Sequence, residues 1–141
     1  MFIGEYNHTV DSKGRVSIPA RFREDLSDTF YITRGPENCL FIYDEEGWKN
    51  IDGTIRSLTL TASNARAFAR LFYSGAMELS LDRQGRVLIP PNLRNYAGIE
   101  KDVVITGVSS RIELWSKEKW DAYIGAQDMS AVTDALHDTG L

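Results

Sequence analysis

The chain has 141 residues, 43% of them hydrophobic, and its 16 Lys and Arg against 20 Asp and Glu give a net charge of −4. This length suits one domain or two small, intimately packed ones, and the acidic balance argues against a uniformly basic nucleic-acid binder. The single cysteine, Cys39, excludes an internal disulfide, and we interpret it as a buried, inert thiol in a reducing cytoplasm. Because no leader and no apolar run of membrane-spanning length occurs, we expect neither a signal peptide nor a membrane anchor.

In chain order, the hydrophobic pattern predicts short strands and short helices. Strands are expected at residues 2–10, 15–18, 30–34, 39–43, 77–81, 86–89, 103–107 and 111–115. The first expected helix covers Pro19 to Leu26. Two longer helices follow: one is capped by Asp44, contains Trp48 and is interrupted at Gly53, and the other is capped by Ser63 or Asn64 and ends at Gly75. A short helix through Leu93 and Ala97 and a final one from Ser116 through Ile124 are expected in the second half. Residues 128–141 carry few large apolar side chains, so we expect them to fray or to dock weakly.

One stretch of this pattern occurs twice. Residues 11–23, DSKGRVSIPARFR, resemble residues 82–94, DRQGRVLIPPNLR, 71 positions later. Asp-x-x-Gly between strands predicts a type I turn with Gly in the left-handed position of a bulge, and the following Pro can begin a helix. Similarity continues as far as Trp48 and Trp120, which indicates one structural unit used twice. We therefore divide the chain into a first repeat at 1–52, a helical connector at 53–74, a second repeat at 75–127 and a tail at 128–141.

The repeated unit is the basic part of this acidic chain. Residues 11–23 carry four basic residues against one acid, a net of +3, and residues 82–94 carry three against one, a net of +2. A local patch matters more than the total charge for binding a polyanion. Since each half is too small to close its own core, we expect the halves to pair about a pseudo-twofold axis and to bring both turns to one face.

An Asp and an Arg flank each turn, Asp11 with Arg15 and Asp82 with Arg86. One interpretation is a hairpin ion pair, which contributes only about 0–1 kcal/mol when exposed. The other is a guanidinium oriented by the carboxylate to meet a phosphate or a guanine edge, and the two are compatible. In the second, Arg15 and Arg86 contact the ligand and the aspartates orient them. Within the turns, Lys13 and Arg83 could add phosphate contacts or be solvated. On the helices, we favour a solvated face for the other three basic residues, Arg21, Arg23 and Arg94.

Catalytic and metal chemistry are not indicated. Two symmetry-related aspartates could form a catalytic carboxylate pair, but the Arg four residues after each would keep it ionised. His8 and His137, the only histidines, lack further ligands at metal-binding spacing. No Gly-rich phosphate loop and no nucleophile elbow occurs. We therefore expect no enzyme, no cofactor, no metal and no small-molecule substrate.

The opening Met-Phe-Ile-Gly-Glu-Tyr-x-His, the two Asp-x-x-x-Arg motifs and Gly-Arg-Val-x-Ile-Pro at 14–19 and 85–90 resemble the MraZ family, over nearly the whole chain before about residue 127. The resemblance implies an α+β fold with a mainly β core, made of two tandem swapped-hairpin AbrB-like half-barrels that form a pseudo-twofold domain with flanking short helices. The family's DNA-contacting motif carries onto Asp11 and Arg15 and onto Asp82 and Arg86. The second turn has Arg83-Gln84 where the first has Ser12-Lys13, so the two motifs need not contact DNA equally.

The function that this resemblance implies is a cytoplasmic, nucleoid-associated transcriptional regulator. MraZ proteins bind direct repeats of double-stranded DNA upstream of the division and cell-wall gene cluster, which includes their own gene, and assemble as ring-shaped homo-oligomers. Phe68, Leu71 and Phe72 could serve that ring interface or the core. The alternative is an AbrB-like protein-interaction module, antitoxin-like, whose tail wraps a partner, although the tail offers little for this beyond Met129, Val132 and Leu136.

Overall fold

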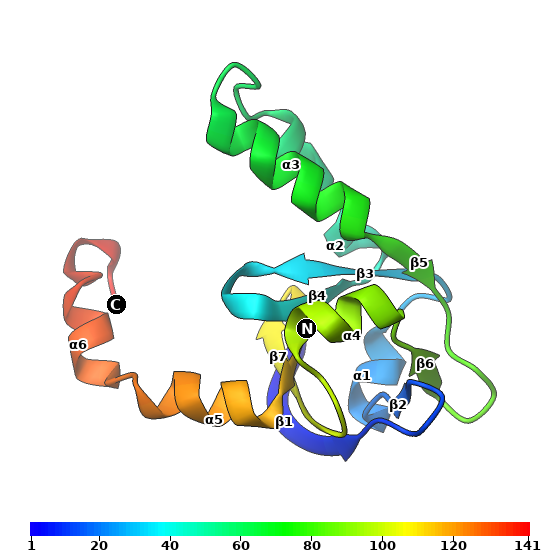
Figure 1. The fold of residues 1–141 in the computed structure, drawn as a ribbon. Helices are drawn as coiled ribbons and strands as arrows, with labels where there is room; N and C mark the ends of the chain where they lie inside the picture. The colour runs from blue at the N-terminus through cyan, green and yellow to red at the C-terminus, as the bar shows by residue number, and fades with distance from the viewer.

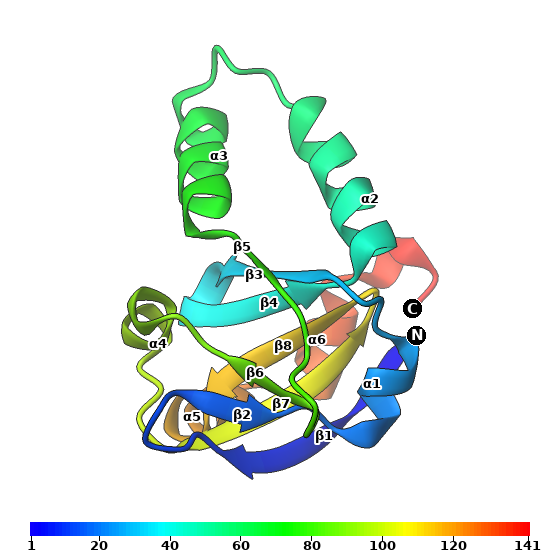
Figure 2. The same cartoon turned by 90° about the vertical axis from the view of Figure 1, so that its right-hand side faces the viewer.

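A six-stranded antiparallel sheet and a separate two-stranded sheet organise the fold in the computed structural model, which describes residues 1–141 (Figures 1 and 2). The larger sheet has the spatial order β1 (Phe2–Thr9), β7 (Asp102–Ser109), β8 (Arg111–Ser116), β4 (Cys39–Tyr43), β3 (Phe30–Gly35) and β5 (Met77–Leu79). The smaller sheet pairs β2 (Arg15–Ser17) with β6 (Arg86–Leu88). This mixed α and β class with a mainly antiparallel sheet agrees with the predicted fold class, while the swapped-hairpin half-barrel arrangement stays a prediction.

The two halves of the chain interleave in both sheets. β1 of the first half pairs with β7 of the second, and β5 of the second half pairs with β3 of the first. β4 and β8 join the halves in the middle of the larger sheet. Neither half can therefore complete its sheets without the other.

The main core lies between the larger sheet and the two-stranded ribbon. Val16 and Val87, opposite each other in the ribbon, are both buried in it, and their neighbours along each strand face outward. This period-two alternation is what a half-buried strand requires. Since burying one such side chain fully stabilises the fold by roughly 1.5–3 kcal/mol, the ribbon is held in place by its inner face, and its outer face is left free.

Two short helices close the core beside the ribbon. α1 (Ala20–Asp25) buries Phe22 edge-on against Phe2 and Tyr6, with ring centroids 5.6 and 5.2 Å apart. α4 (Pro91–Ala97) buries Leu93 and Ala97. Both helices follow a proline, as the repeated Ile-Pro predicted, because a helix start does not need the missing N–H.

Two longer helices project from the sheet as an arm (Figure 2). In α2 (Glu45–Arg56) the predicted Asp44 cap is confirmed, since its carboxylate accepts a hydrogen bond from the amide of Gly47 at 2.7 Å. The predicted interruption at Gly53 is wrong: the helix continues to Arg56, because a single glycine costs a helix only about 1 kcal/mol. A second cluster of Tyr43, Ile55 and Phe72 anchors the arm.

The predicted side-chain cap of the second arm helix is also wrong. α3 (Ser63–Gly75) follows Ala62, and no side chain caps its first turn. Instead Arg66 donates to the carbonyls of Leu60 and Thr61, each at 2.9 Å, and so closes the preceding loop onto the helix. Of the three apolar residues that we expected to serve a ring interface or the core, Phe72 is buried, whereas Phe68 and Leu71 are exposed.

The chain ends in α5 (Lys117–Gly125) and α6 (Met129–Asp134), which extend away from the sheet (Figure 1). The helix expected from Ser116 is present, and Ser116 itself caps it by accepting from the amide of Lys119 at 3.1 Å. The tail that we expected to fray or to dock weakly forms α6 with almost every side chain exposed. Cys39 is buried as predicted, and burial raises the pKa of its thiol to about 12. No helix combines the length and apolar character of a transmembrane span.

Candidate nucleic-acid interface

The first repeated turn is built around the carboxylate of Asp11. One oxygen, Oδ1, accepts the amide protons of Lys13 and Arg15, both at 2.9 Å. The other, Oδ2, accepts from Nε of Arg15 at 2.8 Å. Gly14 closes the turn by donating to the carbonyl of Asp11 at 3.0 Å, with a φ of +86° that glycine adopts without strain. One side chain thus fixes both the turn and the direction of its arginine.

The second turn repeats this geometry. Oδ1 of Asp82 accepts the amide protons of Gln84 and Arg86 at 2.9 Å, and Oδ2 accepts from Nε of Arg86 at 2.9 Å. Gly85 takes the left-handed position with a φ of +75°. Both turns close with a hydrogen bond from the glycine amide to the Asp carbonyl and have the left-handed glycine that the sequence predicted, and both ion pairs exist.

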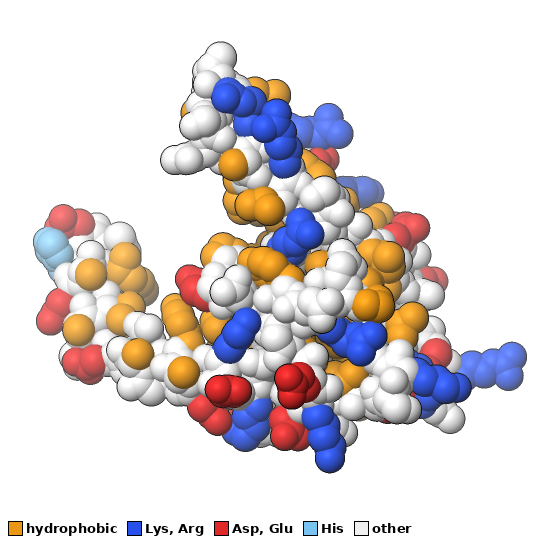
Figure 3. Space-filling view, viewed as in Figure 1, with side chains coloured by type: hydrophobic (Ala, Val, Ile, Leu, Met, Phe, Trp, Pro, Cys, Tyr) orange, Lys and Arg blue, Asp and Glu red, His pale blue; other side chains and the backbone are white.

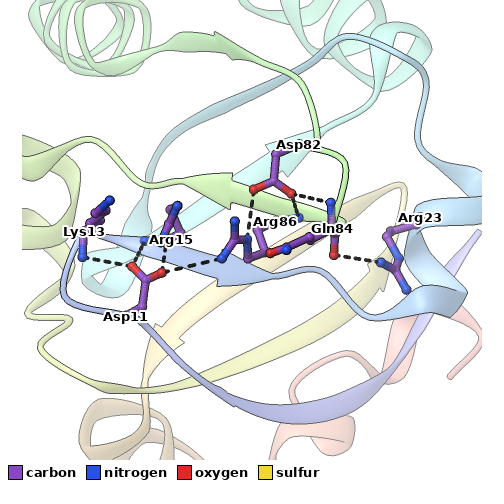
Figure 4. A network of polar contacts seen from close by, with 7 residues as sticks. All are labelled: Asp11, Lys13, Arg15, Arg23, Asp82, Gln84 and Arg86. Atoms are coloured by element: carbon purple, nitrogen blue, oxygen red, sulfur yellow. Dashed lines mark hydrogen bonds and ion pairs between the residues drawn. The ribbon is translucent and has the colours of Figure 1, made fainter.

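The ribbon brings the two turn motifs together, as Figure 4 shows. Because β2 and β6 are antiparallel, Ser17 lies opposite Arg86, and Nη1 of Arg86 reaches to 4.0 Å from Oδ2 of Asp11. Arg86 therefore contacts the aspartates of both motifs, whereas Arg15 pairs only with Asp11. Lys13 and Arg83 are exposed within the turns and make no ion pair through their side chains.

Each turn is also covered by an arginine from the other half of the chain. The guanidinium of Arg94 lies against Gly14, so that a Cβ there would be 2.9 Å from its central carbon. In the same way, Arg23 lies against Gly85 and donates to the carbonyl of Gln84 at 3.4 Å. The interpretation of these two as a solvated helix face is therefore incomplete. The signal was present in the sequence, because this arginine ends both copies of the repeat.

The aspartates are ionised and cannot supply protons near neutral pH. The amide of Arg15, followed by its guanidinium, lowers the pKa of Asp11 from its ordinary 3.8 to about 2. The amide and guanidinium of Arg86 lower the pKa of Asp82 in the same way. A depressed pKa disfavours the acid role in a catalytic carboxylate pair.

Positive charge remains in excess around the ribbon. Six basic side chains surround two aspartates, a net of +4; they are Lys13, Arg15, Arg23, Arg83, Arg86 and Arg94. Figure 3 shows Lys and Arg side chains gathered at the lower right, over the two turns. No group of three or more His, Cys, Asp or Glu side chains is placed to hold a metal ion. The oriented guanidinium groups of this site are suited to the recognition of an anion.

Comparison with known proteins finds one family over both halves of the chain. The family described as "MraZ protein, putative antitoxin-like" matches the chain twice, at residues 1–71 and 72–139. A protein named transcriptional regulator MraZ from Acetivibrio thermocellus is 56% identical over 131 residues, which cover 93% of this chain and 92% of that protein. Proteins of the same name from Thermoanaerobacter sp. and Clostridium tetani are 53% and 51% identical, over 97% and 100% of this chain and 96% and 100% of their own lengths.

Proposed function

Because this chain belongs to the MraZ family, we propose that it is a cytoplasmic, nucleoid-associated transcriptional regulator that binds double-stranded DNA through the β2–β6 ribbon. The observation that carries this proposal is the pair of Asp-x-x-x-Arg motifs joined on the outward face of one ribbon, where Nη1 of Arg86 lies 4.0 Å from Oδ2 of Asp11. The relatives' name supplies the class of function. We propose neither an enzymatic activity nor a cofactor for this protein.

The ribbon has a shape that suits the major groove of DNA. That groove admits a two-stranded β-ribbon, and the outward face of this one presents Arg15 and Arg86. The turns lie at opposite ends of the ribbon because the strands are antiparallel. We propose that Arg15 and Arg86 reach base edges, held by Asp11 and Asp82, and that Lys13 and Arg83 contact the phosphates.

We also propose how the two halves of the chain are arranged and how several copies assemble. The reciprocal exchange of β1 and β5 between the halves supports two swapped-hairpin half-barrels related by a pseudo-twofold axis. One chain offers few phosphate contacts, and each contributes a salt slope of only about −0.9. Several copies in a closed ring on direct repeats gain by effective concentration. The proposed sites lie upstream of the division and cell-wall gene cluster, the protein's own promoter included.

The test is fluorescence anisotropy with duplex DNA from upstream of the protein's own gene, across a salt series and against a scrambled duplex. Base contact predicts that Arg15→Ala lowers discrimination at one position of the site by about 1–3 kcal/mol. Lys13→Ala should weaken binding to all sequences and reduce the salt slope by about 0.9. Arg86→Ala shows whether the two motifs contribute equally.

Arg56→Ala is the matched control. Arg56 on α2 pairs with Asp52 at the same i,i+4 spacing, with Nε 2.9 Å from Oδ2, but it lies on the arm and away from the ribbon. This variant should bind as the wild type does. Loss of binding in Arg56→Ala, or specific binding that survives in the double variant Arg15→Ala, Arg86→Ala, would contradict the proposed interface.

The second candidate function is an antitoxin-like interaction module, which the family description favours. The exposed tail at residues 128–141, which contains α6, is the segment that would bind a partner protein. This candidate predicts a correctly assembled protein that shows no preference for its promoter DNA, with the Asp–Arg pairs serving only the turns.

A further inference from the structure

An apolar groove runs beside α3, at the base of the arm. It has a volume of about 120 Å³ and is lined by Phe68, Leu71, Phe72 and Tyr96 next to Arg34. Leu71 is 57% exposed and Phe68 is 38% exposed, although the sequence pattern places both on the apolar stripe of the helix. An exposed apolar patch rimmed by polar groups is typical of an interaction site. The groove therefore lacks a partner within the chain.

A second apolar surface without a partner lies on the tail. Met129 and Val132 lie one turn apart in α6, at i and i+3, and Leu136 follows shortly after the helix ends; the three are 81%, 44% and 41% exposed. In Figure 1 the tail extends away from the sheet and lies apart from α3. A stripe of this spacing is the form in which an amphipathic helix enters a groove on another molecule.

The two surfaces carry opposite charges. Arg34 lines the groove, and α3, which has no acidic residue, adds Arg70 next to Leu71, while Arg66 is bonded to the loop at the far end of the arm. Residues 126–141 have Asp128, Asp134 and Asp138 and neither Lys nor Arg. Arg70 and Asp134 make no ion pair within the chain. Complementary potentials of this kind favour one pairing and disfavour like-with-like contact.

We propose that the α6 tail of one copy docks into the α3 groove of a second copy of this chain. The two surfaces differ, so the contact is head-to-tail, and repeating it generates a ring if the rotation closes. This inference rests on the proposed self-assembly and assigns the surfaces that form it. The aspartates of the tail would then meet the arginines of α3 around an apolar contact.

Two variants of the full chain test the pairing by complementation. Leu71→Asp disables the groove and keeps the tail, whereas Val132→Asp disables the tail and keeps the groove. Both positions are largely exposed, so circular dichroism should report an unchanged fold. In size-exclusion chromatography with light scattering, we expect the wild type to assemble and each variant alone to remain a monomer. An equimolar mixture should form a dimer and nothing larger, because one functional tail meets one functional groove.

Leu60→Asp is the control, since Leu60 is equally exposed but lies in the loop at the far end of the arm. It should assemble as the wild type does. If Leu71→Asp disturbs folding, Phe68→Asp tests the same groove. A monomeric mixture, assembly of Val132→Asp alone, or a monomeric wild type whose tail folds back on its own groove would each overturn the inference.

The DNA experiment remains independent of this one. A monomeric wild type that still binds its promoter duplex through Arg15 would overturn the interface and leave the DNA reader intact. A wild type that assembles through these surfaces without binding DNA would leave the assembly interface intact and overturn the proposed DNA binding.

Discussion

At the scale of single residues, the aspartate of each turn has two tasks. One carboxylate oxygen satisfies two backbone amides of the turn, and the other holds the guanidinium of the arginine four residues later. The same carboxylate therefore stabilises the turn and orients the arginine, so the structural and the orienting interpretations of the motif are compatible. Replacing Asp11 or Asp82 should loosen the turn and release the arginine together.

The pH dependence of stability tests this at Asp11. Its pKa in the folded protein, about 2, lies below the ordinary 3.8, so the folded state binds fewer protons than the unfolded state between these values. The contribution of the ionised carboxylate is thus fully present above about pH 5 and is lost as the pH falls through about 2. We expect the gap in urea midpoint between wild type and Asp11→Asn to be constant from neutral pH to about pH 5 and to shrink below it.

Asp28→Asn is the control for this measurement, because Asp28 is exposed and makes no ion pair. It should show no comparable gap. A gap for Asp11→Asn that is as large at pH 2 as at pH 7 would contradict the proposed role of the carboxylate.

At the scale of elements, one glycine is needed for strand pairing and another is not needed at all. A Cβ at Gly107 of β7 would collide with the backbone of Phe2 and Ile3 in β1, whereas a Cβ at Gly53 of α2 would meet nothing within 4 Å. Gly107 thus permits the backbones of β1 and β7 to approach closely, whereas Gly53 only weakens α2.

The same substitution at these two positions should have opposite effects. Gly107→Ala should destabilise the protein by about 1–3 kcal/mol, since β1 must move away from β7. Gly53→Ala should stabilise it by about 0.5–1 kcal/mol, since alanine favours the helix interior. Urea denaturation of both variants measures the signs, and a destabilised Gly53→Ala would mean that the helix needs a break there.

At the scale of the whole molecule, stability depends on both halves at once. β1 finds its partner strand in the second half, and β5 finds its partner in the first. The ribbon that carries the candidate interface takes one strand from each half. The interface therefore exists only when the halves are joined.

A chain cut to residues 1–75 tests this dependence. It keeps β1 but loses all of β7, β8, β5 and β6, so we expect no folded monomer. Circular dichroism with light scattering should find either an unfolded chain or a dimer in which a second copy replaces the missing half. A monomer with cooperative unfolding would contradict the interleaved packing.

Local signals in the sequence predicted much of this structure. The Asp-x-x-Gly turns, the helices that follow Ile-Pro and the cap at Asp44 all depend on residues within four positions of one another. Local signals were wrong at Gly53 and at Ser63 or Asn64, where neighbouring contacts outweigh the preference of one residue. In the candidate interface, the repeat identified both Asp–Arg pairs and missed how Arg23 and Arg94 are used.

By itself, the sequence determined the repeated turn, its ion pair and its basic charge, because these follow from backbone geometry and from side chains only four residues apart. The tertiary structure alone decided which strands pair, that Arg86 reaches the aspartate of the other motif, and that each turn is covered by the opposite half's arginine. The contacts of these arginines join residues 61 to 80 positions apart. Their partners are selected by burial of a shared core, and no short stretch of sequence records that selection.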